Sequence, residues 1–270
     1  MIAPRVGDRR PLAVLLLSLV GLSWLTLVVW GVSPYSRYLS HEAIEELGGR
    51  VSLGYAGLAV VFVAAWVLMT VAMMLPTALP LVLLFHRFVA ARRDAARLTA
   101  AIIAGYLLVW TLFGAAAHLN DLGVHTAVAH SRWLEERSWA ISAVTIVVAG
   151  TYQFTPLKYL CLEKCRSPFS FIVAHWHGRK PILEAFRLGI HHGIFCVGCC
   201  WALMLLMFAV GVGNVGWMLG LGAIMAIEKN VAWGRRLTVP LGVLLLVVGM
   251  SLMLAHAGLG SACAHDGSVC

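Results

Sequence analysis

The stretch "HHGIFCVGCCWALMLLMFAVG", residues 191–211, decides the fold of this chain. It places Cys196, Cys199 and Cys200 within five positions and then continues as an unbroken apolar run. A helix of roughly 20 apolar residues crosses the hydrocarbon layer of a membrane, which is about 30 Å thick. The stretch is therefore typical of a membrane-spanning helix that carries thiols near one of its ends.

The rest of the chain has the same apolar character. Of its 270 residues, 61% are hydrophobic and only 12% are charged, and the mean hydropathy is +0.88. No polar stretch is long enough to form a core of its own. We therefore expect an all-α, polytopic membrane helix bundle, with residues 1–270 forming a single transmembrane domain. Apolar runs of sufficient length predict about seven transmembrane helices, near residues 11–33, 54–75, 98–117, 139–160, 191–212, 215–233 and 237–256.

Lysine and arginine gather in alternate connections between these predicted helices. Such residues favour the cytoplasmic side of a membrane. The rich connections carry Arg5, Arg9 and Arg10, then Arg87, Arg92, Arg93 and Arg97, then Lys164, Arg166, Arg179, Lys180 and Arg187, and finally Arg235 and Arg236. This pattern predicts an N-terminus inside and a C-terminus outside. The net charge of +8 then reflects topology and contact with anionic lipid, so the lipid bilayer is an expected partner and nucleic acid is not.

The predicted topology places five cysteines near the cytoplasmic side. Cys161 and Cys165 end the fourth predicted helix, and the triplet begins the fifth. A reducing compartment disfavours structural disulfides, so clustered thiols there indicate metal binding or redox chemistry. Helical spacing puts the first pair on one face and His192 in line with the triplet. We expect a metal site built from Cys161, Cys165, His192, Cys196, Cys199 and Cys200.

Copper is the metal that this set of ligands favours. Thiolates combined with thioethers select Cu(I), and the chain has ten methionines. A set of four sulfurs, or three with one imidazole, also suits zinc, and iron stays open. The alternative is that the cysteines only fill space, because a free cysteine packs as a small hydrophobic residue.

Further ligands are predicted at the inner ends of two other helices. Met73 and Met74 precede Pro76 in the second predicted helix, and core packing is the alternative role for these methionines. Glu228 lies in the sixth predicted helix, where an ionisable group is costly unless it is paired or functional. Its alternative roles are a salt bridge to Lys158, Lys164 or Arg166, or simple solvation at the interface. Lys229 is expected to extend to the lipid headgroups.

A weaker pattern lies on the predicted outer side. His118, Asp121 and His125 follow a helical spacing, and His130 is nearby. Imidazole with carboxylate suits Cu(II), Zn(II) or Fe(II), whereas a solvated loop would explain the same residues. In the tail, Cys263 and Cys270 could form a disulfide, since the space outside is oxidising.

Four blocks of the sequence resemble a bacterial family of predicted metal-binding integral membrane proteins, a domain of unknown function. The blocks are "AMMLPTALP", "GTYQFTPLKYLCLEKCRSP", "HHGIFCVGCCWALM" and "GVGNVGWMLGLGAIMAIEKN", within residues 66–235. The resemblance implies a metal-binding role in a bacterial inner (cytoplasmic) membrane. It places the family pattern on Met73, Met74, Pro76, Tyr152, Gln153, Pro156, Lys158, Cys161, Cys165, Arg166, Gly193, Cys196, Gly198, Cys199, Cys200, Trp201, Met204, Asn214, Glu228 and Lys229.

Three functions are compatible with these observations. The first is copper handling, in which the chain transports copper, inserts it or assembles a cuproenzyme with a membrane or periplasmic metalloprotein partner. The second is a component of a membrane oxidoreductase, either a copper or iron oxygenase or a thiol relay. The third is an assembly subunit of a larger membrane complex. The soft-ligand set favours the first function, and no residue can be given a catalytic role.

Overall fold

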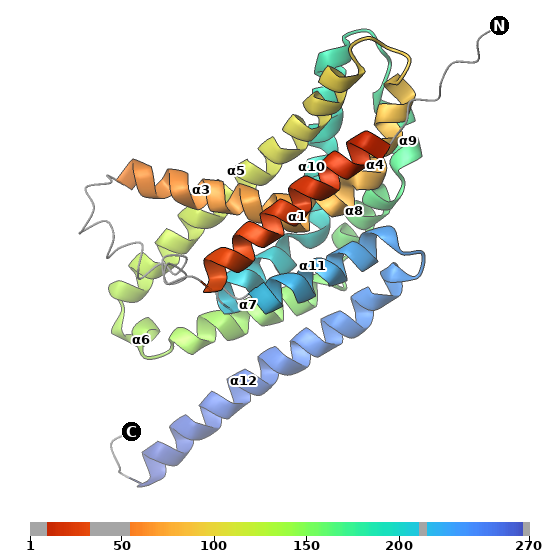
Figure 1. Ribbon diagram of the computed structural model, residues 1–270. Helices are drawn as coiled ribbons and strands as arrows, with labels where there is room; N and C mark the ends of the chain where they lie inside the picture. Colours follow the sequence, from red (N-terminus) through yellow and green to blue (C-terminus); the bar gives the residue numbers. More distant parts are fainter. Residues whose placement is uncertain (1–9, 33–54, 211–214, 267–270) are drawn as a thin grey trace, which may run out of the picture.

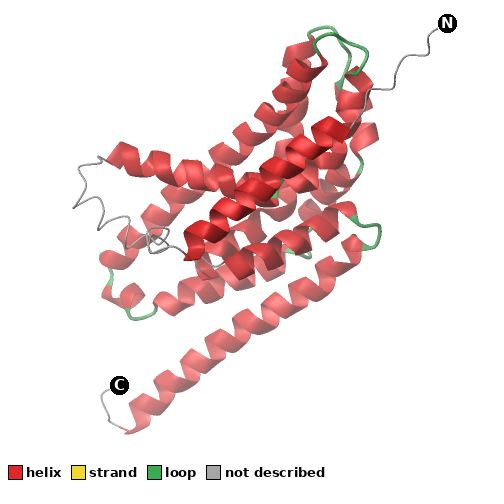
Figure 2. Cartoon of the chain, viewed as in Figure 1, coloured by secondary structure: helices red, strands yellow, loops and turns green. Residues whose placement is uncertain are grey.

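The computed structural model describes residues 10–32, 55–210 and 215–266, and all structural statements below concern these residues. Every regular element among them is a helix, so the predicted all-α class is confirmed for this part of the chain (Figures 1 and 2). In chain order the elements are α1 (Arg10–Val32), α3 (Tyr55–Met73), α4 (Leu75–Val89), α5 (Ala95–Ala129), α6 (Arg132–Glu135), α7 (Ser138–Tyr152), α8 (Pro156–Arg166), α9 (Pro168–His175), α10 (Pro181–Val210), α11 (Val215–Asn230), the 3-10 helix η2 (Gly234–Leu237) and α12 (Thr238–Asp266).

Four stretches of helix are long and apolar enough to cross a membrane. They are Pro11–Val29, Ala95–Ala129, Pro181–Met207 and Gly234–His256. Two bent helix pairs, α3 with α4 and α7 with α8, raise the number to six if each pair is one span. The predicted helix at 215–233 corresponds to α11, which has only 16 residues. Length and composition thus support four to six spans, and the number seven stays a prediction.

Proline explains both bends. The chain turns by 66° between α3 and α4, just before Pro76, and by 65° between α7 and α8, just before Pro156. Proline has no backbone N–H and its ring clashes with the preceding turn, so it kinks or ends a helix but is tolerated in the first turn of a new one, where Pro76 and Pro156 stand. The hydroxyl of Thr155 accepts a hydrogen bond from the first turn of α8 and starts the new helix. The predicted helix at 139–160 is therefore interrupted in its last third.

The two longest helices, α5 and α10, lie against each other in the centre of the bundle (Figure 1). Glycines allow this close approach. A side chain at Gly105 would overlap the carbonyl oxygen of Phe186, and one at Gly189 would overlap that of Ile102. Small residues at such an interface let two backbones pack closely, as is common between membrane helices. The pair α5 and α10 is the scaffold on which the thiols are mounted.

The start of α10 differs from the prediction, which put this end of the helix near residue 191. The carboxylate of Glu184 accepts hydrogen bonds from the backbone N–H groups of residues 177, 178, 179 and 180, at 2.6–3.1 Å. These N–H groups belong to the connection that precedes the helix, so Glu184 holds this connection against the first turn of α10, and a carboxylate in a first turn is favourable to the helix dipole. The helix begins at Pro181. Cys196 lies roughly 22 Å further along the axis, at a rise of 1.5 Å per residue, so the triplet sits in the middle of the helix and the prediction that it begins the helix is wrong.

Candidate metal centre

Sulfur atoms from α8 and α10 meet inside the bundle. The Sγ atoms of Cys165 and Cys199 are 3.9 Å apart, and the three cysteines of α10 are each 1% exposed. With metal–sulfur distances of about 2.3 Å, one ion could contact both atoms of such a pair. One thiol of each predicted segment thus lies beside the other, and their role as metal ligands stays a prediction.

Gly198 makes this meeting of α8 and α10 close. A β-carbon at this position would lie 2.6 Å from the Sγ atom of Cys161, so a larger residue requires the Cys161 side chain or α8 to shift. The hydroxyl of Tyr152, at the end of α7, also donates a hydrogen bond to the carbonyl of Gly198. The second bend of the chain is thereby attached to the middle of α10.

A second sulfur pair joins α10 to the other bend. The Sγ atom of Cys200 is 3.8 Å from the Sδ atom of Met74, and Met74 is fully buried. Met74 is the residue at which α3 ends and α4 begins. Met73 is also buried and packs against the backbone at Gly222 of α11. The two methionines predicted as further ligands therefore line the same core, and one of them contacts a thiol.

Lys229 is the main residue that the sequence prediction misplaced. Its Nζ atom lies 3.0 Å from the sulfur of Cys196, 3.5 Å from that of Cys200 and 3.7 Å from that of Met74. The side chain is 6% exposed, so the prediction that it extends to lipid headgroups is wrong. Residues 228 and 229 both face inward because α11 packs against α8 and α10. An ammonium group buried this deeply needs an anionic partner, and a thiolate at Cys196 would supply one.

Tyr106 of α5 completes the surroundings of Cys196. Its hydroxyl oxygen is 3.1 Å from the Cys196 sulfur and donates a hydrogen bond of 3.2 Å to the carbonyl of Met74. That carbonyl also accepts a hydrogen bond from Thr77. Sequence reasoning missed Tyr106 because a tyrosine in an apolar helix carries no spacing signal of its own.

Glu228 forms the salt bridge that was one of its alternative roles. Both carboxylate oxygens are 3.0 Å from the Nζ atom of Lys158, and Thr238 donates a further hydrogen bond of 3.1 Å to one of them. Lys158 also bonds to Gln153 at the α7–α8 break. These side chains are 0–2% exposed. The pair ties α8, α11 and the start of α12 together beside the thiols.

His192 is buried in α10, four residues before Cys196. Its ring lies 5.9 Å from that of Tyr106 and 5.6 Å from that of Phe171, measured between centroids. Its exposed fraction is 3%, and within the described residues its Nδ1 atom has no hydrogen-bond partner. It stands one helical turn before Cys196, as predicted.

The residues predicted for an outer site are only partly brought together. His125 Nε2 lies 3.8 Å from Asp121 Oδ1, and both line a cavity of about 280 Å³ between α5 and α7. His118 instead stacks on Phe62 at 4.3 Å, and His130 is exposed and bonds to its own helix. Asn214 and Cys270 lie outside the described residues, as does the side chain of Cys263.

In the part of the chain that the structure describes, no three His, Cys, Asp or Glu side chains have the placement of a preformed metal site. The arrangement consists of two sulfur contacts, Cys165 with Cys199 and Cys200 with Met74, and Lys229 lies beside the second. Together with Cys196, the four residues of these two contacts are called the sulfur cluster. Thiolate and thioether are the ligand types that select Cu(I).

The described part of the chain is an all-helical protein with several helices able to span a membrane and a buried set of thiol and thioether side chains. A family model described as copper chaperone, PpoB2, matches residues 63–252. The chain belongs to this copper chaperone family, and the matched region contains every residue of the sulfur cluster. No match was found among curated proteins or among solved structures.

Proposed function

We propose that this chain is an integral membrane copper chaperone that holds Cu(I) at the buried sulfur cluster and passes it to a metalloprotein. Family membership supports the copper part of the proposal. The observation that carries the site is the 3.9 Å contact between the thiols of Cys165 and Cys199, with Cys200 directly after Cys199 and Cys196 about one helical turn before it. These sulfurs come from two helices, so an ion bound between them would link α8 to α10.

The charges around the cluster fit a monovalent ion. One Cu(I) ion bound by two thiolates leaves one negative charge, which is costly in an apolar core unless a cation lies beside it. Lys229 supplies that cation at 3.0 Å from Cys196. In this proposal Lys229 balances the thiolates, and the sulfurs hold the metal.

The membrane placement follows from the helices and the connecting segments. Figure 1 shows the start of α1, the α4–α5 turn, the α9–α10 connection and the α11–η2 turn at one end of the bundle, and α6 at the other. The first of these ends carries the lysine- and arginine-rich connections. We propose that it faces the cytoplasm of a bacterial inner membrane, with seven spans and the C-terminus outside. The copper acceptor is then a membrane or periplasmic metalloprotein.

The test is a Cu(I) titration of the purified chain in detergent under reducing conditions. The triple variant Cys196→Ser, Cys199→Ser, Cys200→Ser is expected to lose Cu(I) binding because serine oxygen is a hard ligand. The matched control is Cys263→Ser with Cys270→Ser, which removes thiols from the tail and is expected to bind copper like the unchanged chain. Full copper retention by the triple variant would overturn the proposed site.

A further inference from the structure

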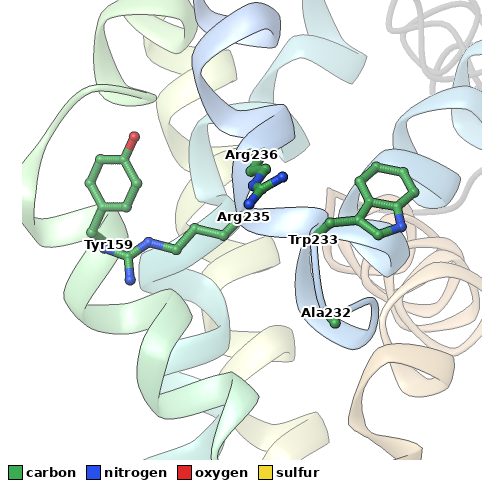
Figure 3. Close-up of a pocket in the computed structure, with 5 residues that line it drawn as sticks. All are labelled: Tyr159, Ala232, Trp233, Arg235 and Arg236. Atoms are coloured by element: carbon green, nitrogen blue, oxygen red, sulfur yellow. The ribbon is translucent and has the colours of Figure 1, made fainter.

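A pocket lined by basic and aromatic residues lies at the turn between α11 and α12. Its volume is about 590 Å³, and it is lined by Tyr159, Ala232, Trp233, Arg235 and Arg236. Figure 3 shows Arg235 reaching from η2 towards Tyr159 of α8, while Trp233 extends to the other side. The pocket thus lies between α8 and the turn that leads into α12.

Two arginine charges in this pocket lack a counter-charge. Within the described residues neither Arg235 nor Arg236 makes an ion pair, and no carboxylate is among the lining residues. The guanidinium of Arg235 lies 5.1 Å from the centre of the Tyr159 ring. Stacking of this kind orients a guanidinium and leaves its N–H donors available. Both arginines are exposed, so an anion can reach them.

The turn that carries the arginines is held in place by the protein itself. Arg166 donates a hydrogen bond of 2.9 Å to the carbonyl of Ala232 and another to the carbonyl of Glu228. A side chain at Gly234 would overlap the carbonyl of Ile227, so glycine lets the turn fold tightly onto the end of α11. The pocket is therefore formed before any ligand binds, which lowers the entropic cost of binding.

The pocket also lies at the level where a membrane span begins. The candidate span Gly234–His256 starts within η2. Trp233 is 53% exposed, as is typical of aromatic residues at a membrane–water interface. Leu160, which follows Tyr159 in α8, and Val239, which follows η2 at the start of α12, are 61% and 48% exposed. A lipid whose chains cover these side chains would bring its headgroup to Arg235 and Arg236.

We propose that this pocket binds the phosphate of an anionic phospholipid headgroup. Arginine forms charge-assisted, bidentate hydrogen bonds to phosphate oxygens, and clustered basic residues beside a membrane helix attract anionic lipid. The proposal rests on the membrane insertion proposed above and is independent of copper binding. Inorganic phosphate shares the same chemistry, so the experiment separates the two sources.

The test uses the delipidated full-length chain in detergent and counts bound lipid by native mass spectrometry. The ligands are phosphatidylglycerol, phosphatidylcholine and inorganic phosphate in separate titrations. The variant Arg235→Gln with Arg236→Gln is expected to bind phosphatidylglycerol about 10- to 30-fold more weakly, at about one factor of five per arginine. The control Arg92→Gln with Arg93→Gln removes the same charge from the α4–α5 turn at the same end and is expected to keep the affinity.

Five results would contradict the proposal. Equal lipid affinity in the double variant and the unchanged chain would show that the pocket does not bind the headgroup, and equal affinity for phosphatidylcholine and phosphatidylglycerol would show that it does not select anionic lipid. An equal loss in the control would mean a diffuse charge effect, and inorganic phosphate binding as tightly as the lipid would mean a free-anion site. If a carbonate wash released the chain from membranes, the chain would not be inserted in the bilayer and the proposal would fail with it. Cu(I) binding is expected to be unchanged in the double variant, which would show that this inference is independent of the copper site.

Discussion

The ammonium nitrogen of Lys229 lies 3.0 Å from the sulfur of Cys196 in the interior of the helix bundle. The two residues come from different helices, α11 and α10, and both are nearly fully buried. A cation placed against a thiol cluster sets the charge that the cluster can hold. It also makes the proposed role of the cluster testable without removing a sulfur.

Changing Lys229 to methionine keeps the length of the side chain and removes its charge. We expect Cu(I) affinity to fall by about 10- to 100-fold, the usual cost of losing a group that supports metal ligands. Competition with a Cu(I) chelator of known affinity measures this. Lys164→Met, at an exposed lysine of α8, is the control, and equal affinities of both variants would contradict the role of Lys229.

Changing Cys165 to serine breaks the closest contact between thiols of two helices. We expect a larger loss of Cu(I) affinity than for Cys161→Ser, because the sulfur of Cys165 faces Cys199 whereas that of Cys161 faces the backbone at Gly198. X-ray absorption at the copper edge checks the result by the number of sulfur ligands. A larger loss of Cu(I) affinity in Cys161→Ser than in Cys165→Ser would show that α8 binds the metal through Cys161 instead.

Changing Gly198 to alanine forces the Cys161 side chain, or α8 with it, to shift. The added methyl would lie 2.6 Å from the Cys161 sulfur, and overpacking of this kind costs about 1–3 kcal/mol of unfolding free energy. We expect a lower thermal unfolding temperature and weaker Cu(I) binding. The matched control is Gly220→Ala on α11, where no atom lies within 4 Å, and there alanine should leave both properties intact.

Breaking the buried Lys158–Glu228 pair from one side should destabilise the fold strongly. Lys158→Met leaves a carboxylate buried without its cation, at a cost of about 3–5 kcal/mol. The double variant Lys158→Met with Glu228→Leu removes both charges and should recover much of the loss. Thermal unfolding followed by tryptophan fluorescence compares them, and a double variant less stable than the single one would contradict a simple charge pair.

The sequence predicts the helical class and the meeting of two thiol-bearing segments for a clear physical reason. Apolar length determines the helices, and the spacing of Cys161 with Cys165 and of the α10 triplet puts each set on one face. The start of α10 could not be predicted in this way, since Glu184 holds the preceding connection against its first turn through four backbone N–H groups.

The inward direction of the Lys229 side chain could not be predicted from the sequence either. A lysine near the end of an apolar helix extends equally well to lipid headgroups, and its direction is decided by which face of α11 meets α8 and α10. The adjacent Glu228 was the available signal. Two neighbouring charged residues at the end of an apolar segment are too costly to face hydrocarbon together, and in the structure each finds a partner inside.

The two proline bends have a mechanical consequence. At Met74 and at Gln153 the regular ladder of backbone hydrogen bonds is already interrupted. A change of the bend angle there breaks fewer hydrogen bonds than bending α5 or α10 would. Both pivots touch the thiol-bearing stretch of α10, one through Cys200 and the other through the carbonyl of Gly198. If copper binds at these thiols as we propose, α4 and α8 are the segments that can turn about the two bends while α5 and α10 keep their places.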